Sequence, residues 1–174
     1  MGLFVKKGVA ETTVRDIAGA VDISEGALYR HFVGKEELVW QLFERHYVAF
    51  AGRLQALADG ETTARGKLGA MIRGFCQAHD DDPTLFHFLL FVQHGQLNRL
   101  ASDVPTPVTV MHAVLSGAIA AGEIPPQDVN LASALALGSV LQPMTFAAYG
   151  RLPQAQVPNA DRLVAAAWAA VTTV

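Results

Sequence analysis

The chain has 174 residues, of which 51% are hydrophobic and 17% are charged, which suits one or two small domains with a sizeable buried core. The formal net charge of −3 excludes a protein coated in basic surface, and the single cysteine excludes an internal disulfide. The charge is uneven: residues 1–35 hold five basic and four acidic side chains, whereas the remainder holds eight and twelve. Phosphate binding is therefore electrostatically favoured only in the N-terminal part.

The apolar segments are interrupted by charge, Pro or Gly before they reach the ~18–20 residues of a membrane span. The nearest case, 131–148, contains Gln142 and Pro143, and we interpret it as a buried interface helix. Lys6 and Lys7 are not followed by the apolar stretch of a signal peptide. The sequence therefore predicts a cytoplasmic protein without a membrane partner.

Residues 1–8 are typical of the end of a helix, with two lysines in the last turn and Gly8 after it. Thr13 then suits an N-cap, and Asp16 three positions later completes a capping box. The helix that follows has one apolar face at helical spacing: Val14, Ile17, Ala18 and Val21. These signals predict two successive short helices.

A tight turn at 21–23 separates that helix from a third. Asp22 tolerates left-handed backbone geometry there. Ser24 can cap a helix over 25–32, and Gly34 can both end it and cap the next. Residues 1–35 are thus predicted to form three short helices, the last two joined as a helix-turn-helix.

The rest of the chain is predicted to be helical as well, because no alternation of strand type persists. One long helix is expected from Lys35 to about Ala58, and a central helix, apolar nearly all round, from Thr84 to about Leu100. The other expected helices run from Thr62 or Thr63 to about His79, from about Val108 to Ala121, from Asp128 onward with a kink or break at Pro143, and from Asn159 or Asp161 to the end. The expected fold is all-α, with about nine helices.

From Phe4 to Leu42 the chain resembles the TetR/AcrR (tetracycline-repressor-like) family of bacterial regulators. The resemblance is carried by Gly8, TTVRDIA at 12–18, Ser24, Gly26, LYRHF at 28–32 and KEEL at 35–38. It implies a helix-turn-helix DNA-binding domain over 1–42 and a helical ligand-binding and dimerisation domain over 43–174. Because the family's first helix usually begins further upstream, we expect the first helix here to be truncated.

The resemblance implies a homodimer whose second motif helices enter the major groove of a palindromic operator. The matching DNA-binding positions are Thr13, Arg15, Ser24, Glu25, Gly26, Ala27, Tyr29, Arg30, His31 and Lys35. Hydroxyls, lysines and helix N-termini are common phosphate partners, and an arginine in the groove can read guanine. Arg15 as a solvated charge and Lys35 as an ordinary first-turn residue remain open alternatives.

Two acidic side chains depart from the family's pattern. Asp22 stands in a turn that usually has small residues, and Glu25 would repel phosphate unless it accepts a hydrogen bond from cytosine. Together with the short start, they leave open a second function. The chain would then be a helical ligand-binding or scaffold protein with impaired DNA binding.

The body is rich in side chains that can line a pocket for a mostly apolar small molecule. The candidates are Met71, Phe75, His79, Phe86, His87, Phe91, His94, Met111 and His112. The two last helices, rich in Ala, Leu and Val, suggest a dimeric four-helix bundle. Its candidates are Leu135, Gly138, Phe146, Leu163 and Trp168. Ordinary core packing remains the alternative for both sets.

Two patterns that contain histidine could indicate a metal site or a catalytic site. His87 and His94 share a helix face, but no carboxylate or third ligand has matching spacing. Cys76 and His79 lie one turn apart, but no third group is placed to orient them. We therefore expect no metal, no cofactor and no catalytic residue, and a small enzyme on these helices is the weakest alternative.

The sequence and the resemblance together predict a transcriptional repressor rather than an enzyme. Its expected partners are a double-stranded operator, a second copy of the chain and an unidentified small-molecule effector. Binding of the effector in the body is expected to release the operator.

Overall fold

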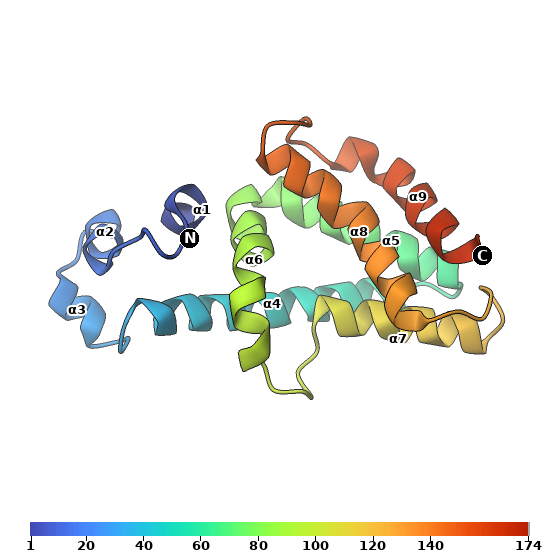
Figure 1. The fold of residues 1–174 in the computed structure, drawn as a ribbon, viewed down its shortest axis with the longest axis horizontal. Coiled ribbons are helices and arrows are strands. Elements are labelled where there is room, and N and C mark those ends of the chain that lie inside the picture. Colours follow the sequence, from blue (N-terminus) through green and yellow to red (C-terminus); the bar gives the residue numbers. More distant parts are fainter. Residues whose placement is uncertain (174) are drawn as a thin grey trace.

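The computed structural model describes residues 1–173, which form nine α-helices, two short 3₁₀ turns and no strand (Figure 1). The all-α prediction with about nine helices is confirmed. The elements are α1 (Gly2–Lys7), α2 (Val14–Ala20), α3 (Glu25–Tyr29), α4 (Lys35–Asp59), α5 (Ala64–Asp81), α6 (Pro83–Gln96), η1 (Leu97–Arg99), α7 (Pro107–Ala120), α8 (Val129–Ala148), η2 (Val157–Asn159) and α9 (Ala160–Thr172).

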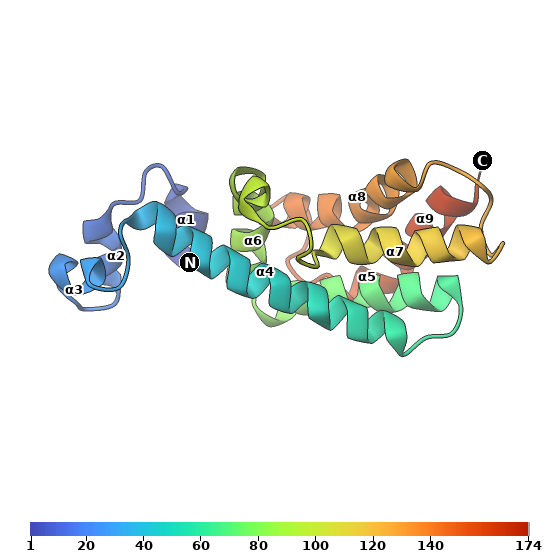
Figure 2. The ribbon, with the colours of Figure 1, turned by 90° about the horizontal axis from the view of Figure 1, so that it is seen from below.

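The N-terminal unit, α1 to α3, lies at one end of the long helix α4, and the body gathers around the other half of α4 (Figures 1 and 2). Two cores reflect this division. The N-terminal core contains Val39, Phe43 and Tyr47 of α4, and the body core contains Leu54 and Ala58 of the same helix. The apolar stripe of α4 therefore continues from one core into the other.

The caps predicted for the motif helices are present. Thr13 Oγ1 accepts a hydrogen bond from the Asp16 backbone N–H at 3.1 Å, and Asp16 Oδ2 accepts from the Thr13 N–H at 2.9 Å. Ser24 Oγ accepts from the Ala27 N–H at 3.1 Å. Asp22 in the turn has φ 53, which is the left-handed geometry predicted for it. The third helix ends at Tyr29, three residues earlier than predicted.

Helix α1 has only six residues, too few to be stable alone. It is held because Phe4, 5% exposed, packs against Phe88 of α6 with ring centroids 5.9 Å apart. Thr12, fully buried after the helix, donates its hydroxyl hydrogen to the Gly8 carbonyl at 2.7 Å. Helix α1 is thus a direct contact between the N-terminal unit and the body.

Two proline residues shape the helices of the body. Helix α5 runs to Asp81, and Asp82 then caps α6 with Pro83 in its first turn, so the chain reverses without a separate loop. Pro143 lies inside α8 and does not divide it.

Helix α8 is also the one helix within residues 1–173 that is long and apolar enough to cross a membrane by length and composition. In its 18-residue window of mean hydropathy 1.4, 39% of the residues are buried inside the protein. The buried residues of α8 include Ala136, Val140 and Met144, which belong to the body core.

Candidate DNA-binding surface and ligand pocket

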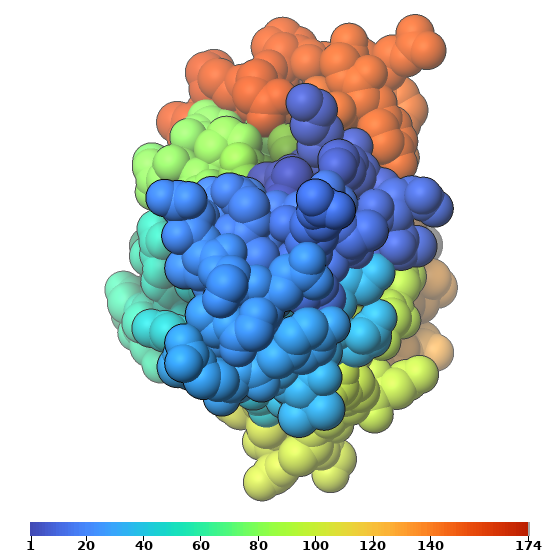
Figure 3. Space-filling view, turned by 90° about the vertical axis from the view of Figure 1, so that its left-hand side faces the viewer, coloured from blue at the N-terminus to red at the C-terminus, as the bar shows by residue number. Residues whose placement is uncertain are grey.

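Helices α1 to α3 form one end of the molecule, which faces the viewer in Figure 3. Leu28 and Ile17 pack inward and fix the two motif helices against the N-terminal core. The predicted DNA-binding side chains Thr13, Arg15, Ser24, Glu25, Gly26, Tyr29, Arg30 and His31 are exposed, and Ala27 is half-buried. Tyr29 is 54% exposed, so its ring is not part of the core.

Lys35 differs from the other candidates because its ammonium group is already engaged. Its Nζ donates to the Val9 carbonyl at 2.7 Å and to the Ala10 carbonyl at 3.1 Å. These bonds tie the start of α4 to the segment after α1. A phosphate contact by Lys35 stays a prediction, and it would have to compete with these two acceptors.

The negative charge of Asp16, at the start of α2, is stabilised by neighbouring groups. The Thr13 backbone N–H, the Thr13 hydroxyl and Lys7, whose Nζ lies 3.2 Å from Asp16 Oδ1, lower the pKa of Asp16 below its ordinary value. The carboxylate therefore stays ionised at neutral pH and remains a strong acceptor for the cap.

A cavity of about 230 Å³ lies between α4, α5 and α6, and is completed by the start of α7 and by α8. Its wall is aromatic and aliphatic. Phe50 of α4 meets Phe75 of α5 edge to face at 5.0 Å and lies 6.3 Å from Phe86 of α6. Leu85, Leu89, Leu90, Leu137 and Leu141 supply much of the remaining apolar surface.

Few polar groups line this cavity. The Tyr47 hydroxyl lies 3.4 Å from the Gln93 amide oxygen, and burial raises the pKa of Tyr47 to about 12, so the phenol stays protonated. Arg53 and Asp81, both half-exposed, form an ion pair at 3.8 Å. Such a cavity suits a mostly apolar molecule with one or two polar groups.

Of the nine pocket residues predicted, Phe75 and Phe86 line this cavity. The others lie outside its lining. Met71, His79 and Met111 are fully buried, His87 is 8% exposed, Phe91 is 40% exposed, His94 is exposed and His112 is half-buried. The sequence analysis missed the contribution of α4, because Tyr47 and Phe50 of that helix also line the cavity.

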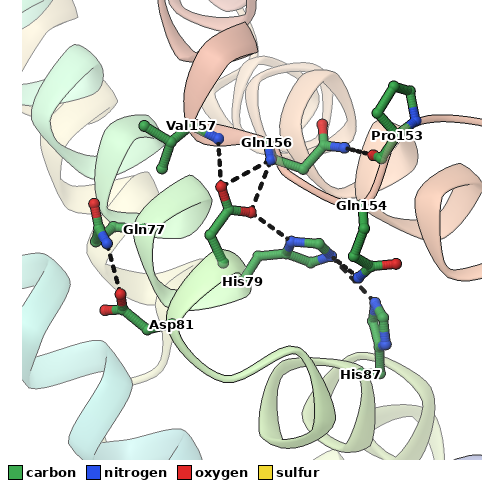
Figure 4. A network of polar contacts seen from close by, with 9 residues as sticks. Gln77, His79, Asp81, His87, Pro153, Gln154, Gln156 and Val157 are labelled. Carbon is green, nitrogen blue, oxygen red and sulfur yellow. Dashed lines mark hydrogen bonds and ion pairs between the residues drawn. The ribbon is translucent and has the colours of Figure 1, made fainter.

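A polar cluster lies beside the cavity, around His79 (Figure 4). His79 Nδ1 is 3.0 Å from Asp80 Oδ1, and its Nε2 is 3.2 Å from Nε2 of His87 and 3.4 Å from Nε2 of Gln154. Burial and the nearby His79 lower the pKa of His87. His87 therefore pairs with His79 and not with His94, which is exposed.

Cys76 is not placed to act as a nucleophile. Burial and the charge of Asp80 raise the pKa of its thiol to about 11, so the thiol stays protonated at neutral pH. It belongs to the body core and is fully buried.

The outer face of α8 carries exposed apolar side chains. Leu131 is 60% exposed, and Leu135 and Phe146, two of the predicted dimer contacts, are 44% and 45% exposed. Gly138 is exposed between them, and Trp168 of α9 is half-buried. Leu163, in contrast, is buried in the body core of the same chain. Leu135, Gly138 and Phe146 thus lie on an accessible surface, whereas Leu163 is buried in the core and Trp168 packs partly against the same core.

Comparison with known proteins agrees with this description. Residues 1–42 match the family model described as bacterial regulatory proteins, tetR family. Over 103 residues the chain is 31% identical to the HTH-type transcriptional repressor KstR2 of Mycolicibacterium smegmatis. The aligned segment covers 59% of this chain and 48% of that protein. The chain spans about half the length of the curated relatives it matches.

Two solved structures share the fold across nearly the whole chain. The regulator FadR from Bacillus subtilis, in complex with stearoyl-CoA, matches with a TM-score of 0.76 at 20% identity, covering 99% of this chain and 94% of FadR. KstR2 of Mycobacterium tuberculosis, a ketosteroid transcriptional regulator, matches with a TM-score of 0.72 at 23% identity, covering 99% and 90%. The relatives are transcriptional regulators and not enzymes. Residues 1–42 thus carry the motif of the tetR family of bacterial regulatory proteins, and the whole chain shares the helical fold of these two solved regulators.

Proposed function

We propose that the protein is a homodimeric repressor that binds a palindromic operator and releases it when a mostly apolar small molecule enters the body. The observation that carries this proposal is the continuity of α4, which starts beside the exposed motif helices and continues into the wall of the apolar cavity. A DNA-binding role also supports a location in the cytoplasm. No catalytic role is proposed.

The proposed DNA-binding domain is 1–42, with α3 entering the major groove. Gly26 has no side chain to hold the backbone away from DNA, and Arg30 is free to reach a base edge. Tyr29 and Thr13 offer exposed hydroxyls for phosphate oxygens. Base contacts from α3 would set the operator sequence, and the hydroxyls would set the orientation.

The proposed ligand-binding and dimerisation domain is 43–174. The aromatic wall around Phe50 and Phe86 favours an alkyl chain or a fused apolar ring. FadR, which shares this fold, is described in complex with stearoyl-CoA, so fatty acyl-CoA molecules are the natural first probes. A ligand that favours one arrangement of α4 and α6 would change the separation of the two recognition helices, which must match half-sites about 34–36 Å apart.

Selection of bound DNA from a random pool tests operator recognition. We expect a palindrome, and we expect Arg30→Ala to weaken its binding by about 10-fold or more because a bidentate base contact contributes about 1–3 kcal/mol. Arg151→Ala, in the exposed loop after α8, serves as a control that should bind normally. Failure to enrich any sequence at low salt would contradict the proposal.

Ligand response is tested by titrating stearoyl-CoA and shorter acyl-CoA molecules into the protein–operator complex. Leu90→Trp should fill part of the cavity and prevent release, whereas the adjacent Phe91→Trp, outside the lining, should leave release intact. Fluorescence anisotropy of labelled operator measures both. Equal loss of release in the two variants would argue that the cavity is not the effector site.

The alternative of a helical ligand-binding or scaffold protein rests on the exposed Asp22 and Glu25 on the motif surface. Both carboxylates lie on the side proposed to meet phosphate, where like charge is unfavourable. Under this alternative, no operator is selected and ligand binding persists.

A further inference from the structure

His79, His87 and Gln154 form a cluster that the proposed function does not use (Figure 4). The three side chains come from α5, α6 and the segment between α8 and α9. His79 is fully buried and His87 is 8% exposed, whereas Gln154 is exposed. The cluster thus has two fixed imidazoles inside the protein and one amide on the solvent side.

The orientation of His79 is fixed by Asp80. Because the carboxylate lies 3.0 Å from Nδ1, the proton of the neutral imidazole belongs on Nδ1. The carboxylate is itself held by backbone N–H groups of Gln156 at 2.7 Å and Val157 at 2.8 Å. Nε2 of His79 therefore presents a lone pair, in the carboxylate–histidine arrangement that orients imidazole ligands in metal sites.

The distance between the two imidazoles also suits a shared metal ion. Nε2 of His79 and Nε2 of His87 point toward each other and are 3.2 Å apart. With metal–nitrogen bonds of about 2.0–2.1 Å, that separation corresponds to an angle of about 103° at the ion, close to tetrahedral. The same distance fits a direct hydrogen bond from the neutral His87 Nε2–H, so binding of the ion requires the His87 proton to move to Nδ1 and both rings to turn their Nε2 lone pairs toward the ion.

A third ligand is available at the open side. The Gln154 amide lies 3.4 Å from Nε2 of His79, and turning the amide over exchanges its nitrogen and oxygen. Within residues 1–173 no group of three His, Cys, Asp or Glu side chains is placed to hold a metal. An amide oxygen and a water molecule would therefore complete the coordination of the two imidazoles.

We propose that Nε2 of His79, Nε2 of His87 and the amide oxygen of Gln154 bind one divalent transition-metal ion, with Zn²⁺ as the best fit. Imidazole nitrogens favour zinc and its neighbours over magnesium or calcium. The ion would link α5 and α6 to the segment before α9. Because α6 also lines the cavity and contacts α1 through Phe88, metal binding would restrict the helix that touches both functional regions.

Metal titration of the full chain, after removal of any histidine tag, tests the proposal directly. We expect calorimetry with ZnSO₄ to saturate at one ion per chain, and Co²⁺ to give the visible absorption of a four-coordinate site. His87→Phe should weaken binding by more than about 100-fold, since loss of even an outer-shell partner costs 10–100-fold. Gln154→Ala, an exposed change, should weaken it by about 10-fold.

His94→Gln is the matched control, because it removes an exposed histidine from the same helix. It should bind Zn²⁺ like the unchanged protein, and Zn²⁺ should raise the Tm of both but not of His87→Phe. Absence of stoichiometric binding overturns the proposal, as does equal binding by His87→Phe and the unchanged protein. Neither the binding measurement nor the Tm measurement involves DNA, so they test the metal site independently of the proposed repressor function.

Discussion

Asp80 connects α5 to the segment before α9 through a single carboxylate. Burial opposes its ionisation, but hydrogen bonds from His79 and from the backbone of Val157 and Gln156 outweigh this effect and lower the pKa of Asp80. A carboxyl group with a depressed pKa in the folded state stabilises the fold above its unfolded pKa of about 3.9. That stabilisation is lost as the pH falls through the lower, folded value.

We therefore predict that Asp80→Asn lowers the free energy of unfolding at pH 7 by about 1.5–3 kcal/mol, because charged hydrogen-bond acceptors contribute that much. The difference from the unchanged protein should begin to shrink below about pH 4, where the unfolded chain takes up the proton, and should disappear once the pH falls below the depressed pKa of the folded carboxyl group. Urea unfolding at several pH values measures this. Asp81→Asn, an exposed neighbour, should have little effect at any pH.

For single residues, helix caps and turn geometry could be predicted from the sequence, but contacts between residues on different helices could not. The capping box of Thr13 and Asp16 and the left-handed Asp22 follow from residue type and spacing alone. His79 and His87, however, meet because the chain reverses at Asp82 and Pro83. Helical periodicity suggested His94 as the partner of His87 because it treats each helix separately.

Helix α6 shows why the pocket residues were hard to predict. It was expected to be central, and it does contact three regions: α1, the body core and the cavity. A helix that is apolar nearly all round gives no indication of which side faces which neighbour. Phe88 faces α1, whereas Phe86 faces the cavity and Phe91 is 40% exposed.

The contact between α6 and α1 can be tested by removing its larger ring. Phe88 is fully buried, so Phe88→Ala should destabilise the protein by about 3–5 kcal/mol. Backbone amides of residues 2–7 should then exchange hydrogen much faster, because α1 cannot persist undocked. Phe91→Ala on the same helix should leave their exchange nearly unchanged, and a similar loss of protection in both variants would contradict this role for Phe88.

The whole molecule has an apolar outer surface on α8 that a second copy would cover. Leu131, Leu135 and Phe146 are spaced along one side of the helix, and the exposed Gly138 between them permits close approach. Sequence composition suggested this face, but it also suggested Leu163, which lies in the core. Ala-rich helices have similar residues on all sides. The exposed and the buried faces therefore become distinct only through the packing of α9 on α8 and α5.

We predict that Leu135→Glu prevents formation of the proposed dimer and leaves a monomer at micromolar concentration. Each interface would gain two buried charges without partners, and an uncompensated buried charge costs about 3–5 kcal/mol. Sedimentation velocity measures the change in mass. Val21→Glu places the same charge on an exposed apolar site of the N-terminal unit, and it should sediment like the unchanged protein.

The bonds from Lys35 to the carbonyls of Val9 and Ala10 have a mechanical consequence. They fasten the segment between α1 and α2 to the first turn of α4, so a tilt of α4, together with α6 on which α1 packs, would carry the three small helices with it. With 25 residues, α4 is about 37 Å long, and a tilt of about 5° at its far end displaces the near end by about 3 Å. That displacement is close to the ~3.4 Å between successive base pairs. If the protein binds an operator as proposed, a tilt of this size would shift each recognition helix by about one base step.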